Sequence, residues 1–440
     1  MEFIKRLRRY RFFQHSFTEP SQFFDSLIVV PSMIGKLTNL NVLNKDHQVF
    51  TWNLAPVVTG MIVYFYTSFD TAYAVRESTE ELIFCLVTIG IGIQGAGRIF
   101  TFLIFREKLV WIHQYTTDLY REECNPRTKS FLMDSVFLLS VVLKVMLTCY
   151  AFTSISMDVA PLLFTIVSGE KILPFGFYLP YLDRFTWFGY FSNYVMHIFM
   201  TVYVSSMDMG TDSIYMMTLM SAFTQIDLLK LSLEEMSEMV DQKHEDLENF
   251  FKKLINRHQE HLQYLRTVEI VYCFNFFLTF LCLASVLIMS LFAVVKVSLL
   301  NVTQNNQFTK INQTTPWFSQ LSWYQGYVFI AFISYQLFFG CFLGTLLAMK
   351  VIALFRRVNP LLIVGFGPFQ NEQLQHEIYK ISWYKLSIPH QKLLQFILKS
   401  AQEPVCLTVI FAPLDMGTFL QVYKSIYSMF TMLLTVQEEE

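Results

Sequence analysis

The chain has 440 residues, of which 53% are hydrophobic and only 15% are charged. Soluble proteins carry about a quarter charged residues, so this composition excludes an ordinary soluble protein and indicates an integral membrane protein. The formal net charge of −2 provides no overall field that would attract nucleic acid. The seven cysteines show neither the spacing of a disulfide framework nor that of a metal site.

Six stretches are apolar enough to cross a bilayer, which takes about 20 residues of helix. They cover residues 54–69, 82–105, 131–153, 185–207, 270–295 and 323–349. A seventh stretch, residues 405–435, is more polar and carries Asp415, Gln421 and Lys424. The sequence therefore predicts an all-α fold. We expect a bundle of seven transmembrane helices that forms one integral membrane domain over residues 1–440.

Lysine and arginine concentrate in every second connecting segment. Of the 33 basic residues, 25 lie in segments 1–50, 106–130, 208–268 and 350–404, whereas five lie in the alternate segments. Because basic residues accumulate on the cytoplasmic side, the N-terminus is predicted to be cytoplasmic and the C-terminus extracellular. This orientation is the reverse of that of G-protein-coupled receptors.

The sequence also contains two candidate glycosylation sites on the predicted outer side. They are the N-x-S/T sequons at Asn301 and Asn312, both within the polar segment 296–322. N-glycosylation takes place on surface segments outside the cytosol, so these positions agree with the predicted orientation.

The two longest cytoplasmic segments are predicted to be helical anchor segments. Residues 208–268 have apolar side chains at helical spacing and no Pro or Gly after Gly210, so both flanking spans are expected to continue into the cytosol as helices. A solvated linker is the alternative. Residues 350–404 are interrupted at Asn359-Pro360 and around 365–368, and helical periodicity returns over 373–398.

One short motif resembles a nucleotide-binding loop. The sequence GIGIQG at 90–95 matches the dinucleotide pattern G-x-G-x-x-G, but that pattern acts at a strand-to-helix turn, and this copy lies inside a predicted span. Gly92 and Ala96 are expected to allow close helix packing instead. No catalytic constellation occurs in the sequence, so neither an enzyme activity nor a cofactor or metal is predicted.

Four titratable side chains in or near apolar segments need separate consideration. Arg98 lies in the inner third of its span and is expected to snorkel toward the inner headgroups. Lys144 lies near the middle of its span, where packing and functional roles both stay open. His258 and His261 have no third metal ligand at a suitable spacing and are expected to be surface residues.

The C-terminal part of the chain resembles the final helix of insect odorant receptors. The segments that carry the resemblance are QEPVCL at 402–407, FAPLDMGTF at 411–419 and YKSIYSMFTMLL at 423–434, together with Trp383 and Tyr384. The chain lacks the ending typical of the related gustatory receptors. Its tail also differs from that of the odorant receptor co-receptor, so it is similar to a divergent odorant-tuning subunit.

The resemblance implies a tetrameric, non-selective cation channel that assembles with the odorant receptor co-receptor in the plasma membrane of olfactory sensory neurons. Four final helices would then line one pore. On a helical wheel Ser428, Met432 and Thr435 share one face, with Val436 at its edge. Met432 and Val436 would close the pore by dewetting, and Thr435 would supply oxygens to a passing cation. A buried packing helix is the alternative.

Lys424 conflicts with this arrangement. It lies within about 40° of Ser428 on the same wheel, and four ammonium groups below the gate would oppose cations. A position toward a neighbouring subunit, or in a hydrated vestibule where ions screen charge, would reduce this repulsion. The sequence leaves both arrangements open.

The resemblance also implies that an odorant binds in the outer half of the helix bundle. Four spans carry aromatic rings and a few hydroxyls there, which suits a small volatile organic molecule. Tyr190, Tyr194 and His197 share one stripe of a helix. Ordinary helix packing is the alternative for any single residue. The candidate ligand-binding residues are Ile83, Phe84, Val87, Met146, Tyr150, Tyr190, Tyr194, His197, Tyr324, Tyr327 and Ile330.

Three other classes of protein stay open from the sequence. A G-protein-coupled chemoreceptor would place its C-terminus in the cytosol, and a gustatory receptor-type channel would carry the ending that this chain lacks. A transporter would show internal repeats and spans broken near the middle of the membrane, and none is found here.

Overall fold

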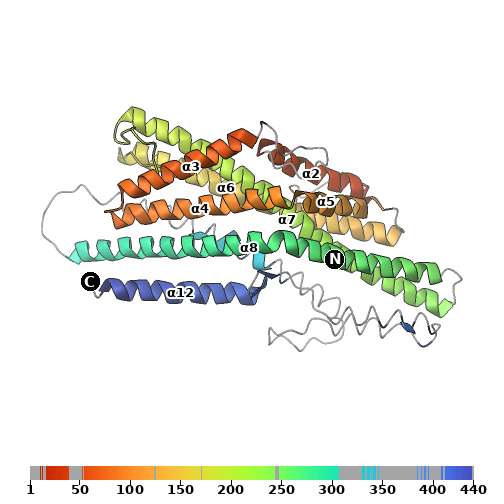
Figure 1. The fold of residues 1–440 in the computed structure, drawn as a ribbon. Helices are drawn as coiled ribbons and strands as arrows, with labels where there is room; N and C mark the ends of the chain where they lie inside the picture. The colour runs from red at the N-terminus through yellow and green to blue at the C-terminus, as the bar shows by residue number, and fades with distance from the viewer. Residues whose placement is uncertain are drawn as a thin grey trace.

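The computed structural model describes residues 16–38, 54–122, 125–169, 171–242, 247–306 and 412–438, with isolated positions at 10, 12, 52, 408–409 and between 330 and 395. These residues form long helices that run side by side along an elongated bundle (Figure 1). The helices are α2 (Pro20–Leu37), α3 (Leu54–Ala74), α4 (Thr79–Ile104), α5 (Arg106–Arg121), α6 (Pro126–Ser168), α7 (Trp187–Gln242), α8 (Leu247–Asn306) and α12 (Met416–Glu438).

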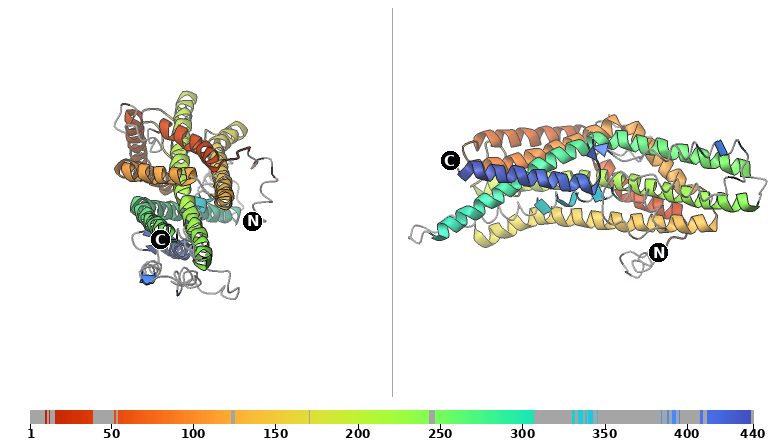
Figure 2. Two further views of the ribbon diagram at one scale, coloured as in Figure 1. Left: turned by 90° about the vertical axis from the view of Figure 1, so that its right-hand side faces the viewer. Right: turned by 90° about the horizontal axis from the view of Figure 1, so that it is seen from below.

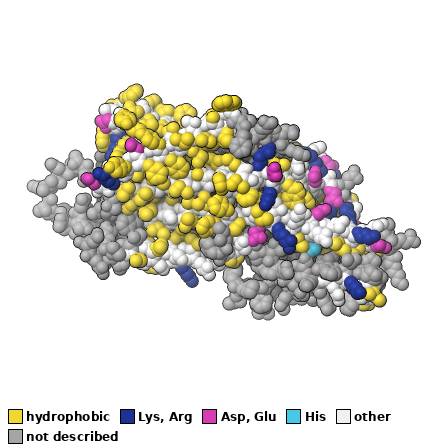
Figure 3. Space-filling view, viewed as in Figure 1, with side chains coloured by type: hydrophobic (Ala, Val, Ile, Leu, Met, Phe, Trp, Pro, Cys, Tyr) yellow, Lys and Arg dark blue, Asp and Glu magenta, His cyan; other side chains and the backbone are white. Residues whose placement is uncertain are grey.

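The bundle has an apolar part and a charged part. Hydrophobic side chains cover the part formed by α3, α4, the end of α6 and the start of α7, and charged side chains gather around α2, α5, the end of α7 and the start of α8 (Figure 3). Within the described residues, three helical segments are long and apolar enough to cross a membrane: Glu81–Ile104, Pro126–Val167 and Leu247–Met289. The apolar band therefore marks the part of the bundle that faces lipid.

Helices α7 and α8 extend far beyond the apolar band. They are 56 and 60 residues long, and in the charged part they form an antiparallel pair with its own small core of Leu229, Leu233, Met236, Val240, Phe251 and Leu254. The helical continuity expected of segment 208–268 is present on both sides of residues 243–246. The cytosolic location of this pair stays a prediction.

Two helices in the charged part have no counterpart among the predicted elements. α2 begins with Pro20 in its first turn, and α5 follows α4 after the single residue Phe105. Phe24 of α2 stacks on Tyr120 of α5 with ring centroids 4.5 Å apart, and both rings are buried. Both helices are amphipathic rather than continuously apolar, so a search for membrane spans passes over them.

Small residues let α4 lie very close to its neighbours. A Cβ atom added to Gly92 would lie 2.4 Å from Cε1 of Tyr64 on α3, and one added to Gly90 would lie 2.7 Å from Cγ2 of Val286 on α8. The glycines of the GIGIQG motif are therefore contact points between membrane helices, as the sequence predicted.

The last helix begins later than the predicted span 405–435. Residues Thr408–Val409 (β1) and Ala412–Pro413 (β2) form a short antiparallel hairpin, and α12 starts only at Met416. Asp415 accepts a hydrogen bond from the backbone N–H of Thr418 at 2.7 Å, which is the geometry of a helix N-cap. The prediction failed here because Pro413 and Asp415 favour a turn and a helix start more strongly than a continued helix.

Candidate ligand site and pore helix

Most of the predicted ligand-binding residues point into the bundle. Tyr324 and Tyr327 lie outside the described residues, and Phe84 and Ile330 are partly buried. The remaining residues are buried: Ile83, Val87, Met146, Tyr150, Tyr190, Tyr194 and His197. They do not form one cluster, because the packing separates them into three groups.

The first group surrounds His197 of α7. Its Nε2 atom lies 2.9 Å from the backbone oxygen of Phe177, and its ring centroid lies 4.8 Å from that of Phe177 and 5.4 Å from that of Phe175. Phe177 also meets Tyr64 of α3 edge-on, with ring centroids 5.1 Å apart. The connection between α6 and α7 therefore folds inward and contributes aromatic rings to the candidate site.

Sequence reasoning missed this connection because residues 154–184 were predicted to be an outer loop. A Cβ atom added to Gly176 would lie 2.5 Å from Cδ1 and 3.0 Å from the backbone carbon of Phe84 on α4, so the loop backbone packs directly on that helix. The only sequence signal was the run Pro174-Phe-Gly-Phe177, which is too apolar for a solvated loop.

The second group joins α7 to α6. The Tyr190 hydroxyl donates to Oγ1 of Thr165 at 3.0 Å, and the Tyr194 hydroxyl donates to the backbone oxygen of Asp158. The two tyrosine ring centroids lie 5.5 Å apart. Thr201, further along α7, donates to the Asp158 carboxylate at 2.8 Å. Both tyrosine hydroxyls are thus engaged by α6, and their rings supply the apolar surface.

The third group lies at the contact of α4, α6 and α7. Val87, Met146 and Tyr150 belong to the main hydrophobic core, and Ile330 packs against it. The Tyr150 hydroxyl donates to Asp212 of α7 and accepts a hydrogen bond from Gln336 at 2.9 Å. Because Asp212 also binds Arg98, Tyr150 lies at the level of Arg98, toward the C-terminal end of α4. Its position in the outer half of the bundle stays a prediction.

The prediction that Arg98 snorkels to the headgroups is wrong. Its side chain is 3% exposed, and Nη1 lies 3.0 Å from Asp208, 2.9 Å from Asp212 and 2.9 Å from Oγ1 of Thr211. Two carboxylates on one helix face compensate the buried guanidinium, so the charge has no need to reach water. The signal available in the sequence was the Asp208/Asp212 pair at i,i+4 within an apolar helix.

Lys144 also contacts the chain itself. Its Nζ atom donates to the backbone oxygen of Phe12 at 2.9 Å and lies 5.5 Å from the centroid of the Phe12 ring. Phe12 therefore contacts this cation at the surface of α6. The contact fits a packing role for Lys144.

His258 and His261 are not surface residues, in contrast to the prediction. They are 9% and 5% exposed, and Nδ1 of His261 lies 2.8 Å from Oε1 of Gln225 on α7. Tyr264, one turn further along α8, donates to the backbone oxygen of Thr218 at 3.0 Å. These side chains hold α7 and α8 together. The sequence alone could not distinguish the buried face of α8 from its exposed face, because both faces carry polar side chains.

Helix α12 packs on the rest of the chain through one face only. Thr418 and Ile426 are buried, and Phe419, Val422 and Tyr423 pack against the main core. Lys424, Ser428 and Met432 are exposed on the other side, with Met432 67% exposed. Thr435 and Val436 belong to the helix, but their side chains lie outside the described set. In two views α12 lies beside α8 at the edge of the bundle (Figures 1 and 2).

Comparison with known proteins identifies the family. A sequence model described as "7tm Odorant receptor" matches residues 78–356 and 369–427, which is most of the chain. The chain belongs to the insect odorant receptor family. A relative in Drosophila melanogaster, named as odorant receptor 83c, is 20% identical over 403 residues, which cover 84% of this chain and 90% of the relative.

Solved structures of odorant receptors share the fold. The insect olfactory receptor OR5 from Machilis hrabei in complex with eugenol aligns over 94% of this chain and 98% of its own, with a TM-score of 0.69 at 14% identity. A second structure of the same receptor gives a TM-score of 0.68 at 13% identity. The predicted all-α bundle of seven transmembrane helices is confirmed. The chain is a multi-pass membrane receptor of the odorant receptor family and not an enzyme.

Proposed function

We propose that this odorant receptor is a subunit of an odorant-gated, non-selective cation channel that assembles with the odorant receptor co-receptor in the plasma membrane of olfactory sensory neurons. The observation that supports a pore most directly is the uncovered face of α12. A helix packed through one side against its own chain offers the other side to neighbouring subunits or to water.

The composition of that face suits a gated pore. Ser428 places a hydroxyl on it, and Met432 follows one turn beyond Ser428. Lys424 is exposed on the same side, and a position toward a neighbouring subunit or in a hydrated vestibule would reduce its repulsion of cations. A ring of four Met432 side chains, with Val436 one turn further, is narrow and apolar enough to exclude water when closed. Thr435 would provide oxygen ligands next to this constriction.

The proposed ligand is a small volatile organic molecule held among the buried residues of the three groups. Their side chains offer aromatic rings and aliphatic carbon, and the hydroxyls of Tyr150, Tyr190 and Tyr194 are already engaged by other helices. A site of this kind gains affinity from apolar contact, with a few polar groups that fix orientation. Membrane lipid would surround the apolar band of the bundle.

The test is to record currents from cells that express the chain with the co-receptor, against a panel of volatile ligands. We expect odorant-evoked cation currents that are absent when only the co-receptor is present. A chain that reaches the surface with the co-receptor but gives no odorant-evoked current would contradict the proposal. A C-terminal epitope that stains only after permeabilisation would instead support a G-protein-coupled receptor.

A further inference from the structure

A buried ionic cluster in the core lies between the candidate ligand site and the contacts of α12. Arg98 of α4 binds Asp208 and Asp212 of α7, and Asp212 also accepts the hydroxyl hydrogen of Tyr150 on α6. This buried ionic cluster joins three helices. Arg98 is the only cation in this cluster, so removing it would leave two carboxylates without a compensating charge.

Gln336 extends the cluster to another part of the chain. Its Nε2 atom donates to the Tyr150 hydroxyl at 2.9 Å, and its Oε1 atom lies 3.5 Å from Nε2 of Gln94 on α4. Gln336 is therefore hydrogen-bonded to Tyr150, which is itself a candidate ligand-binding residue. Gln94 is buried, so this contact lies in the core of the bundle.

The same short segment also holds α12. Residues 334–336 are helical, and two residues along a helix point to nearly opposite sides, about 200° apart. Gln336 faces the ionic cluster, whereas Ser334 accepts a hydrogen bond from the hydroxyl of Tyr423 on α12 at 2.6 Å. The segment thus lies between the bundle and the helix proposed to line the pore.

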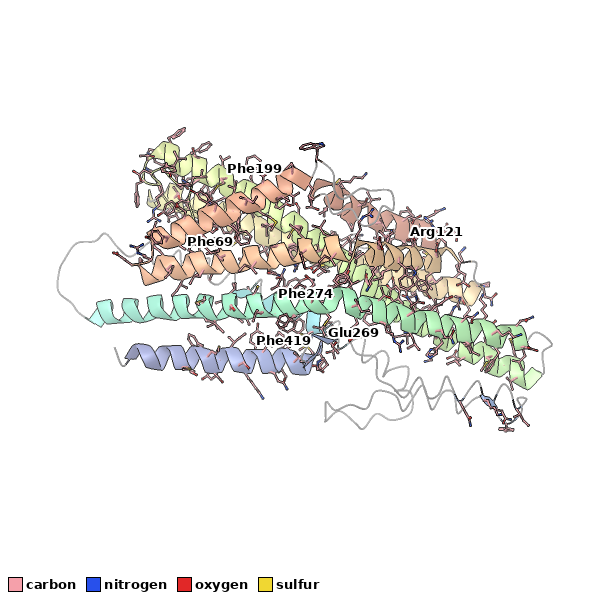
Figure 4. The ribbon with its side chains drawn as sticks, in the orientation of Figure 1. Phe69, Arg121, Phe199, Glu269, Phe274 and Phe419 are labelled. Atoms are coloured by element: carbon pink, nitrogen blue, oxygen red, sulfur yellow. The ribbon has the colours of Figure 1, made fainter. Side chains whose placement is uncertain are left out.

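Two further contacts fix the start of α12 to residues near this segment. The ring of Phe338 meets the ring of Phe419 edge-on, with centroids 5.8 Å apart, and Oγ1 of Thr345 accepts from the backbone N–H of Met416 at 2.8 Å. Figure 4 shows Phe419 near the start of α12 and Phe274 and Glu269 on the neighbouring part of α8. Movement of Ser334, Phe338 and Thr345 would therefore displace α12 directly.

We propose that Gln336 is a positioning residue that couples the Arg98–Asp208–Asp212–Tyr150 cluster to the pore helix through Ser334 and Tyr423. This inference rests on the proposed channel function. An odorant that packs against Tyr150 moves its hydroxyl relative to Asp212. Because the hydrogen bonds of the cluster are directional, Gln336 and its helical segment move with it. Gln336 affects the efficacy of the odorant and need not contact it.

The experiment uses two variants that each remove the same hydrogen bond, Gln336→Leu and Tyr150→Phe, expressed with the co-receptor. The readout is the maximal odorant current divided by the current evoked by a co-receptor agonist. The agonist current reports assembly and pore function independently of this subunit's ligand site. We expect either variant to lower this ratio about fivefold or more, at the lower end of typical coupling between sites. The double variant should be no lower than the singles.

The matched control is Ser205→Ala. Ser154 donates to Ser205 at 2.6 Å across the same α6–α7 contact, and among the described residues Ser205 has no hydrogen bond to Ser334 or Gln336. We expect its ratio to equal that of the parent chain. Equal ratios in all variants, or losses that multiply in the double variant, would overturn the inference and leave the channel function intact. If the parent chain gives no odorant current while the co-receptor agonist still opens channels, the proposed function is wrong, and this inference falls with it.

Discussion

At the scale of single residues, burial decides which candidate side chains can shape a ligand site. Tyr194 is 5% exposed and its hydroxyl is bound by α6, whereas Phe199 on the same helix is 72% exposed. Both are aromatic residues of α7, but only Tyr194 faces the interior. In Figure 4 the labelled Phe199 lies on α7 in the apolar part of the bundle. The two positions offer a matched pair for testing the site.

We expect Tyr194→Ala to shift the odorant concentration response by about tenfold or to change the rank order of odorants. Loss of a buried aromatic ring removes on the order of 1–3 kcal/mol of apolar contact with a ligand. Concentration–response curves measure the shift, and the co-receptor agonist controls for surface assembly. Phe199→Ala should leave sensitivity and ranking unchanged. Parental sensitivity and ranking in Tyr194→Ala would place the ligand elsewhere.

At the scale of elements, α12 combines a packed face with an exposed face that carries the proposed gate. Replacing Met432 with Ser should raise the current without odorant, because a hydroxyl-lined constriction holds water more readily than an apolar one. Tyr427→Ser is the control, since Tyr427 is also exposed but lies about 140° away around the helix. Basal current is measured at equal surface expression. An unchanged basal current in Met432→Ser would remove Met432 from the gate.

The α2–α5 contact gives a second prediction at this scale. His113 of α5 is partly buried, and burial lowers its pKa to about 4, with Arg121 acting in the same direction and Asp25 opposing it. The unfolded chain titrates near 6.5 and so binds a proton more readily than the folded chain. Stability is therefore fully present above pH 6.5 and is lost as the pH falls from 6.5 toward 4.

The measurement is thermal unfolding of the purified protein in detergent between pH 7.5 and 5.5. The parent chain should lose about 1 kcal/mol from His113 at pH 5.5, and His113→Gln should lose less over the same range. Lys108→Gln on the same helix is the control for a general change in surface charge. Identical pH profiles for the parent and His113→Gln would show that this histidine is already solvated in the folded protein.

At the scale of the whole molecule, the orientation in the membrane decides on which side the three groups of candidate ligand-binding residues and the end of α12 lie. Asn301 lies within α8, and Asn312 lies outside the described residues. We expect the outer placement of segment 296–322 to allow glycosylation at Asn312, with a glycosidase-sensitive mass that disappears in Asn312→Gln. A reporter sequon inserted near Ser237 of the α7–α8 pair should stay unmodified. Modification at the inserted site would reverse the proposed orientation.

The sequence by itself determined that this is a helical membrane protein with small-residue contacts on α4, because apolar length and composition are properties of local sequence. Its C-terminal motifs also indicated its family. Only the tertiary structure decided how the candidate residues divide into groups. Arg98 and its two carboxylates are more than a hundred residues apart along the chain, and Phe177 reaches His197 through a connection that the sequence places outside. Such partners depend on which helices lie together, and helix packing is set by side-chain fit that no local pattern records.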